Sequence, residues 1–173
     1  MGTKLVGDFF QRDIFIVAQE LIGKQMVRKR KDGQQTYYRI TEIELYVGEE
    51  DLACHASKGR TRRTEVMYSS GGNVYVYLIY GMYWLFNIVT GEVDNPQAIL
   101  IRGLDDIIGP GKVGKQLELD MSFYGEDLTT SKRVWLEDDG RRYSFTKHPR
   151  INIEYAGEVW KKKPYRYVLN KLV

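Results

Sequence analysis

The sequence predicts a single domain of the α+β class, in which strands joined by tight turns outnumber a few short helices. Its 173 residues are enough for one sizeable hydrophobic core and too few for two comfortable domains. Helical spacing of apolar residues marks the segment Asp13–Ile22 near the start of the chain. Two pairs of strand-like stretches then meet at turn signals, one at Lys31–Gln34 and one at Tyr80-Gly81.

The N-terminal helix is expected over Asp13–Ile22, because its apolar residues fall on one stripe and Gly23 is typical of a helix end. Strands are expected at Gln25–Arg30 and Thr36–Val47, on either side of the first turn. In the second of these strands the side chains alternate between two faces. Ile43, Leu45 and Val47 share one face, and Glu42, Glu44 and Tyr46 share the other.

The stretch Val74–Val89 is predicted to be a hairpin with a two-residue turn at Tyr80-Gly81, since aromatic and β-branched residues alternate along it and glycine permits the turn. The hairpin tip therefore carries a tyrosine with nothing behind it to pack on. Proteins that enter the DNA minor groove push such side chains between base steps. The plainer alternative is a hairpin whose tyrosines are half-buried sheet residues.

Shorter elements complete the chain. A helical turn is expected at Thr64–Tyr68, a buried strand at Gln97–Gly103, a proline-initiated helix from Gly109 to Leu117, and two strands, Arg133–Glu137 and Arg141–Phe145, flanking the turn at Asp138–Gly140. The buried strand carries Arg102 near its end, and a charge in such a place needs a partner.

The composition, 43% hydrophobic and 28% charged, is that of a soluble globular protein. A net charge of +3 permits a nucleic-acid partner without demanding one. The single Cys54 excludes an intramolecular disulfide framework, and no apolar run resembles a signal peptide or a membrane span. We therefore expect an intracellular protein of the cytoplasm with no membrane partner.

Glu44 is the residue most suited to catalysis. An isolated glutamate on a strand face is usually a solvated charge. Arg102 changes this interpretation, because a strand-end arginine could keep Glu44 ionised and help to hold a water for general-base activation. No metal or cofactor is expected, since the two histidines and Cys54 lack the paired spacing of zinc sites, and Gln116 follows Lys115 where a phosphate-binding loop has Ser or Thr.

Seven segments, in order through nearly the whole chain, closely resemble the alkyladenine (3-methyladenine) DNA glycosylases. They are FFQRD at 9–13, LIGKQMVR at 21–28, TEIELYVGEEDLACHASKGRT at 41–61, VYVYLIYGMYWLFN at 74–87, AILIRGL at 98–104, GPGK at 109–112 and HPRINI at 148–153. The resemblance implies one domain over residues 1–173, built on a curved, largely antiparallel sheet with surrounding helices and a protruding hairpin.

The same resemblance implies a role for individual residues. Glu44 is the expected general base, and Arg102 helps to place its water together with a main-chain carbonyl of Pro149–Ile153. Three further residues, Tyr46, His55 and Tyr77, match the aromatic side chains that enclose the everted base. Asn87 matches the residue that disfavours guanine by crowding its exocyclic amino group. Tyr80 matches the tyrosine that fills the gap left in the duplex.

The implied reaction is base excision repair by a monofunctional glycosylase, which hydrolyses the N-glycosidic bond of alkylated purines in double-stranded DNA. Expected bases are 3-methyladenine and 7-methylguanine, with hypoxanthine and ethenoadenine as further candidates that need a donor or acid such as His55. No lysine on the Glu44 face offers a Schiff-base amine.

Contacts to DNA phosphates are expected from Arg60, Arg62, Arg63 and Lys112, together with Lys161–Lys163. The enzyme is expected to be a monomer.

Three positions depart from the family pattern. Leu45 stands where a smaller alanine is usual, and Gly71-Gly72 stands where proline-glycine is common. Asn152 replaces a glycine, which predicts a shifted pocket or substrate range.

Two alternative functions stay open. One is a catalytically inactive nucleic-acid-binding module of the same fold, and the other is a small-nucleoside hydrolase, which would need no tip residue such as Tyr80.

Overall fold

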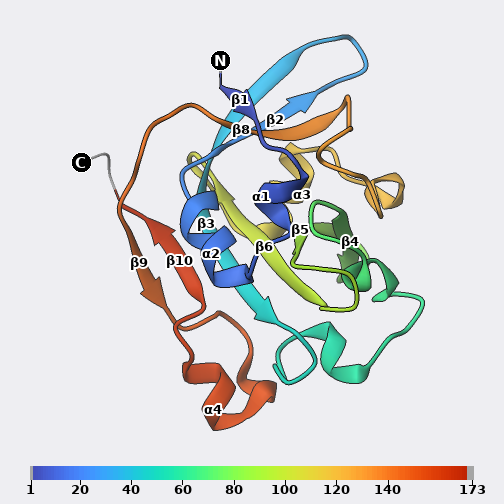
Figure 1. Cartoon of the computed structure of the whole chain (residues 1–173), viewed down its shortest axis with the longest axis vertical. Helices are drawn as coiled ribbons and strands as arrows, with labels where there is room; N and C mark the ends of the chain where they lie inside the picture. The colour runs from blue at the N-terminus through green and yellow to red at the C-terminus, as the bar shows by residue number, and fades with distance from the viewer. Residues whose placement is uncertain (1, 171–173) are drawn as a thin grey trace.

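Strand β3 (Gln35–Val47) is the long central strand of an antiparallel sheet in the computed structural model, which describes residues 2–170 (Figure 1). Among these residues ten strands join the sheet, whose main path runs β1-β8-β2-β3-β6-β5-β4 and does not close. The remaining strands are short additions, with β7 beside β6 and β10 between β3 and β9. The predicted α+β class and largely antiparallel sheet are confirmed.

The other strands are β1 (Thr3–Lys4), β2 (Gln25–Lys29), β4 (Val74–Ile79), β5 (Tyr83–Thr90), β6 (Gln97–Leu104), β7 (Ile107–Ile108), β8 (Val134–Asp138), β9 (Phe145–His148) and β10 (Arg166–Leu169). The α-helices are α1 (Gly7–Phe10), α2 (Ile14–Leu21), α3 (Pro110–Gln116) and α4 (Gly157–Lys162). Single 3₁₀ turns occur at η1 (His55–Lys58), η2 (Glu65–Tyr68), η3 (Met121–Phe123) and η4 (Glu154–Ala156). Within residues 2–170, no helix has the length and apolar character needed to cross a membrane.

Helix α2 covers one face of the sheet, as its apolar stripe predicts. Asp13 caps it by accepting a hydrogen bond from the Phe15 N–H, and Gly23 follows its end with a φ of +87°. The stripe packs against β3 and β6, where Ile43 and Ile101 are fully buried. Each such side chain contributes about 1.5–3 kcal/mol when it leaves water, so this face holds the main core.

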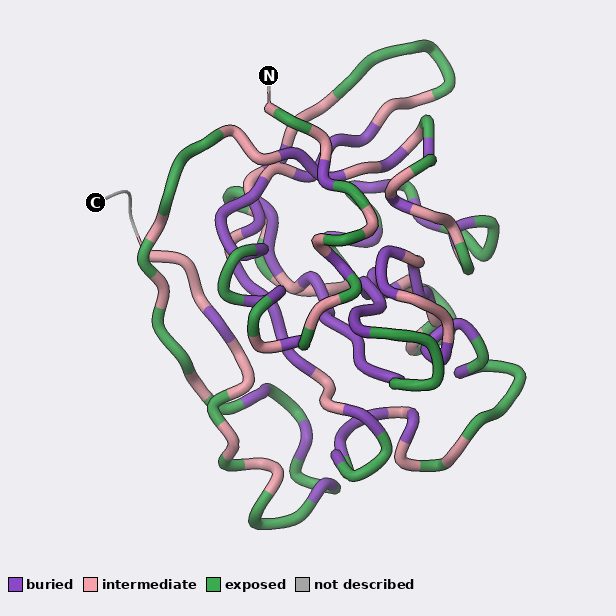
Figure 2. Tube along the Cα trace, in the orientation of Figure 1, coloured by how far each residue is buried: buried purple, intermediate pink, exposed green. Residues whose placement is uncertain are grey.

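Helix α3 packs against β5 and β6 and adds to the same core. It begins with a proline, as predicted. Gly114 makes its close approach to β5 possible, because a Cβ there would collide with the main-chain oxygen of Trp84. Figure 2 shows the buried trace concentrated in the middle of the sheet, with exposed residues at the outer turns. The opposite face of β3, β6, β5 and β4 is covered by loops, and it carries the candidate site.

The hairpin of β4 and β5 forms as predicted, but its turn is one residue longer. Ile79 pairs with Tyr83, so Tyr80, Gly81 and Met82 form the loop. Both Tyr80 and Gly81 have positive φ, of 51° and 64°. An aromatic residue seldom adopts this conformation, which turns the ring outward and leaves Tyr80 85% exposed.

The strand expected at Arg133–Glu137 forms as β8, shifted by one residue, but the strand expected at Arg141–Phe145 does not form. Strand β8 already lies between β1 and β2, so neither of its edges is open to the chain that follows. Arg142 instead pairs with Asp138, and the Tyr143 ring lies under the Arg39 guanidinium. The next strand begins only at Phe145 and pairs with β10, which in turn borders β3 beside Glu44.

Candidate functional site

Strand register places four residues in one row across the loop-covered face of the sheet. Glu44 of β3 pairs with Leu100 of β6, Leu100 pairs with Asn87 of β5, and Asn87 pairs with Tyr75 of β4. Neighbouring strands lie about 4.8 Å apart, so the backbones at Glu44 and Asn87 are separated by about 10 Å. The row therefore sets a carboxylate and an amide on the same face of the sheet, with the buried Leu100 of β6 between them.

The Glu44 carboxylate is buried, with only 1% of the side chain exposed. Its Oε1 accepts a hydrogen bond of 2.9 Å from the Tyr46 hydroxyl, and its Oε2 accepts one of 2.7 Å from the Ile151 N–H. Burial raises the pKa of Glu44 above its usual value, although these donors and the nearby Arg102 oppose that effect. A carboxylate in this state is well suited to accept a proton near neutral pH.

Arg102 bonds to a different glutamate from the one that the sequence favours. Its Nε donates to Glu42 Oε1 at 3.2 Å, whereas its Nη1 lies 3.7 Å from Glu44 Oε1. Glu42 also accepts from Arg166 of β10, so one carboxylate holds two guanidinium groups. The 3.7 Å between Arg102 and Glu44 is too long for a direct hydrogen bond, so the two groups form an ion pair only.

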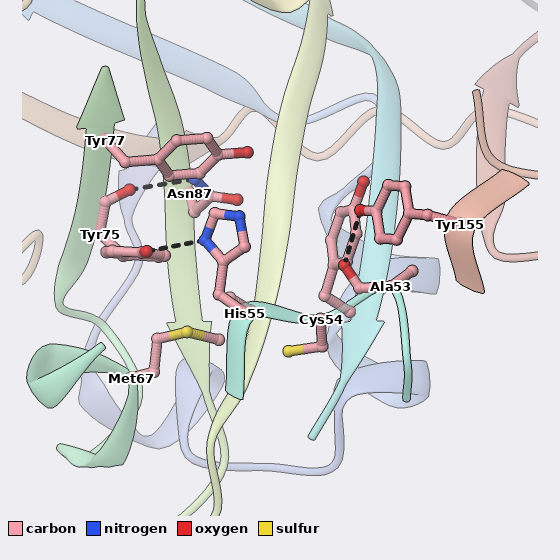
Figure 3. A pocket seen from close by; sticks show the side chains of 10 residues that line it. Ala53, Cys54, His55, Met67, Tyr75, Tyr77, Asn87 and Tyr155 are labelled. Atoms are coloured by element: carbon pink, nitrogen blue, oxygen red, sulfur yellow. Dashed lines mark hydrogen bonds between the residues drawn. The ribbon is translucent and has the colours of Figure 1, made fainter. Parts of the chain in front are cut away.

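A cavity with about 40 Å³ of free volume, drawn in Figure 3, has Tyr46 in its wall, and the Tyr46 hydroxyl links this wall to Glu44. It is lined by Tyr46, Ala53, Cys54, His55, Met67, Tyr75, Tyr77, Asn87, Ala98 and Tyr155. All four predicted wall residues, Tyr46, His55, Tyr77 and Asn87, are therefore brought together. Sequence reasoning missed Tyr75 and Tyr155, although alternation along β4 puts Tyr75 on the same face as Tyr77.

His55 is neutral in this site. Burial lowers its pKa to about 4, and the charge of Arg63 adds to the shift. Its Nδ1 lies 2.8 Å from the Tyr75 hydroxyl, and its ring meets the Tyr77 ring edge to face at 4.6 Å between centroids. When the Tyr75 hydroxyl donates to Nδ1, Nε2 carries the proton and remains a donor. The ring therefore offers an aromatic surface and a neutral polar group.

Cys54 also lines the cavity, but burial raises the pKa of its thiol to about 12. It is therefore no nucleophile near neutral pH. Among residues 2–170, no three His, Cys, Asp or Glu side chains form a group that could hold a metal ion.

An ion pair between Asp51 and Arg150 supports the site from behind, and sequence reasoning missed it. Both side chains are fully buried, and the two guanidinium nitrogens donate to the carboxylate at 2.5 and 2.9 Å. Arg150 also donates to the Leu45 carbonyl and lies 4.9 Å from the Tyr46 ring centre. The pair thus fixes the backbone that carries the Ile151 N–H to Glu44.

Asn152 follows this segment in the left-handed region, with a φ of 58°. Asparagine tolerates that conformation better than most residues, which explains how it can stand in place of glycine. Its side chain is exposed and does not line the cavity. The expectation that Asn152 shifts the pocket finds no support in this position.

The basic side chains predicted to contact phosphates differ in whether they already form ion pairs within the protein. Arg60 is engaged by Glu65 and Asp94 at 2.7 and 3.0 Å. Arg62 and Arg63 are exposed and form no ion pair within residues 2–170, and the Arg63 guanidinium lies 5.1 Å from the Tyr77 ring centre. Lys112 is exposed in the first turn of α3, next to Gly111, which lies against the Tyr83 side chain at the tip end of the hairpin. In the C-terminal lysine run, Lys161 and Lys162 both pair with Glu158.

The chain is similar to one family throughout its length. The family model described as methylpurine-DNA glycosylase matches residues 8–108 and 105–172. A relative from Natranaerobius thermophilus is 41% identical, with 90% of each chain covered, and one from Borrelia garinii is 40% identical, with 95% of this chain and 96% of the relative covered. A third, from Psychrobacter cryohalolentis, is 40% identical over 87% of this chain and 84% of its own. All three carry the provisional name 3-methyladenine DNA glycosylase.

Proposed function

The chain belongs to the methylpurine-DNA glycosylase family and is thus a DNA glycosylase, a hydrolase of N-glycosyl bonds, and from this premise we propose how it acts. It turns alkylated purines out of duplex DNA, binds them in the cavity beside Glu44, and hydrolyses the bond between base and deoxyribose. Its main substrates are 3-methyladenine and 7-methylguanine. It works as a monofunctional, monomeric enzyme inside the cell, where its DNA substrate lies.

The observation that carries this proposal is a buried carboxylate one hydrogen bond away from an aromatic cavity. Glu44 itself does not line the cavity, but Tyr46 does, and its hydroxyl bonds to Glu44 at 2.9 Å. A base in the cavity would present its glycosidic bond toward this carboxylate. A water bound by both Glu44 and Arg102 would then be close to the sugar carbon that it attacks.

Alkylation supplies the leaving group, because a cationic purine departs as a neutral base. The oxygen of the water forms the new bond to the sugar carbon while Glu44 takes the proton and the glycosidic electron pair leaves with the base. The anionic Glu44 also stabilises the positive charge that develops on the sugar. No acid is needed at the departing base for these lesions.

The neutral His55 supports selection of cationic bases. Tyr46, Tyr77 and His55 offer ring faces and edges that attract a positive purine, whereas a charged imidazole would repel it. Because His55 protonates only near pH 4, it is a poor acid for neutral lesions such as hypoxanthine. We propose that it serves those lesions only as a hydrogen-bond donor, and that Asn87 crowds the amino group of guanine.

Tyr80 fills the space left by the everted nucleotide, and its exposed position at the hairpin tip supports this role. Tyr80→Ala should lower the rate of base release from a fully paired duplex by about tenfold to a hundredfold, since opening a base pair costs a few kcal/mol. The loss should be smaller for the same lesion opposite a mismatch, where the pair opens more easily. Single-turnover rates on the two duplexes test this, and equal losses on both would contradict the wedge role.

Base release should fall as the pH is lowered through the raised pKa of Glu44, because only the ionised carboxylate accepts the proton of water. Since burial shifts this pKa upward, the acid limb should have its midpoint above 4.5, the ordinary value for the group. His55 titrates lower, at about 4, and does not set this limb. Single-turnover rates for 3-methyladenine between pH 4 and 9 measure the midpoint, and a flat profile down to 4.5 would contradict the assignment.

Arg62, Arg63 and Lys112 are the phosphate contacts that the geometry favours, because they are exposed around the cavity and the hairpin. Arg60 must first leave Glu65 and Asp94, so we rank it below them. Such contacts position the duplex without reading its sequence.

Release of free 3-methyladenine from methylated duplex DNA, measured by chromatography of the soluble bases, tests the proposal. The wild-type protein should release the base with strand breaks appearing only after alkali, because no lyase step follows. Binding to the damaged duplex without release would contradict the proposal and favour an inactive binding module. Equal release from free methylated nucleosides would favour a nucleoside hydrolase.

A further inference from the structure

The base cavity is too small for a purine as it stands. Its free volume of about 40 Å³ holds a few waters at about 10–15 Å³ each, whereas pockets for small molecules typically measure about 300–1,000 Å³. One of its walls must therefore move when a base enters.

Most of the walls are held in place. Tyr46 bonds to Glu44 and lies against Arg150, and His55 bonds to Tyr75. Asn87 donates to the Tyr75 carbonyl at 3.1 Å. Moving any of these side chains would break buried hydrogen bonds, which is costly.

Tyr155 is held less firmly than these walls. It is 71% exposed although it lines the cavity, and its one hydrogen bond is a long contact of 3.3 Å from its hydroxyl to the Ala53 carbonyl. Figure 3 shows its ring across the cavity from His55 and Tyr77. The backbone on both sides is anchored, because Ile153 and Ala156 are buried against Ala53. The side chain can therefore swing while its 3₁₀ turn, η4, stays in place.

We propose that Tyr155 is the movable wall of the base pocket, which swings outward to admit the purine and closes on it from the side opposite His55. The residue thereby limits the size of the base that the enzyme accepts and is a determinant of specificity. The inference rests on the proposed glycosylase function.

The test compares single-turnover release of 3-methyladenine with release of 1,N6-ethenoadenine, whose added ring makes it bulkier. Tyr155→Ala should raise the ratio of ethenoadenine to 3-methyladenine rates by about tenfold, the lower end of what pocket-size differences produce. Tyr155→Phe keeps the ring and should hold the ratio within about twofold of wild type. Val159→Ala, an equally exposed side chain on the neighbouring α4, is the control and should change nothing.

A second measurement separates base contact from DNA contact. Affinity for a duplex with an abasic-site analogue should be unchanged in Tyr155→Ala, because no base fills the pocket. If the wild type releases 3-methyladenine but Tyr155→Ala keeps the wild-type ratio, the movable wall is overturned and the glycosylase function stands. If the wild type releases neither base, both proposals are overturned.

Discussion

Replacing Glu44 with glutamine should reduce the rate of base release by about 10³-fold while leaving the affinity for damaged duplex DNA within about threefold. Removal of a general base has an effect of this order, since proton transfer contributes about 10²–10⁴-fold. The fold should survive, because the amide oxygen can accept from the Ile151 N–H and its NH₂ can donate to the Tyr46 hydroxyl. The loss should therefore lie in the chemical step.

Single-turnover release of 3-methyladenine measures the first quantity, and titration with a fluorescent duplex measures the second. Glu118→Gln is a matched control, because it removes the same charge from an exposed residue paired with Arg30. Its rate should equal that of the wild type. Release by Glu44→Gln within tenfold of wild type would contradict the role of Glu44.

Replacing Arg150 with methionine should lower the free energy of unfolding by about 3–5 kcal/mol. Asp51 would then be a fully buried carboxylate without its counter-charge, and breaking a buried pair from one side has this cost. The double variant Arg150→Met/Asp51→Asn should recover part of the loss, because the asparagine carries no charge. Urea unfolding followed by tryptophan fluorescence measures all three proteins.

Arg12→Met provides the comparison for this pair, since Arg12 forms an exposed pair with Glu20 at 2.8 Å. Exposed pairs contribute about 0–1 kcal/mol, so its stability should stay within that range of the wild type. An Arg150→Met protein that loses less than about 1 kcal/mol would show that Asp51 finds water or another partner. Such a result would remove the argument that this pair fixes the backbone next to Glu44.

The elements that the sequence predicts well are those set by local rules. Helix α2 follows from its apolar stripe and its flanking Asp13 and Gly23, and the face shared by Glu44 and Tyr46 follows from alternation along β3. The pairing of β9 with β10 joins separate segments, and no local signal in Arg141–Phe145 excludes the strand expected there. Long-range pairing of this kind depends on which sheet edges remain open, a property of the whole fold.

In the candidate site too, some features can be predicted from the sequence and others depend on the whole fold. Resemblance to the family picks out the cavity walls, and the structure brings Tyr46, His55, Tyr77 and Asn87 to one cavity. The burial of Glu44 depends on residues 149–152, far away in the chain, and the neutral state of His55 depends on its burial against Tyr75 and Tyr77 of β4. Tyr155 lies in a segment after the last matching motif, so neither alternation nor resemblance draws attention to it.

A crystal structure of Glu44→Gln bound to duplex DNA with a single alkylated adenine tests the central claim most directly. The account predicts the damaged base inside the cavity between His55 and Tyr155, with its glycosidic bond facing residue 44 and the Tyr80 ring in the emptied stack. A damaged base that stays stacked in the helix, or one that leaves it for a surface remote from residue 44, would contradict the account.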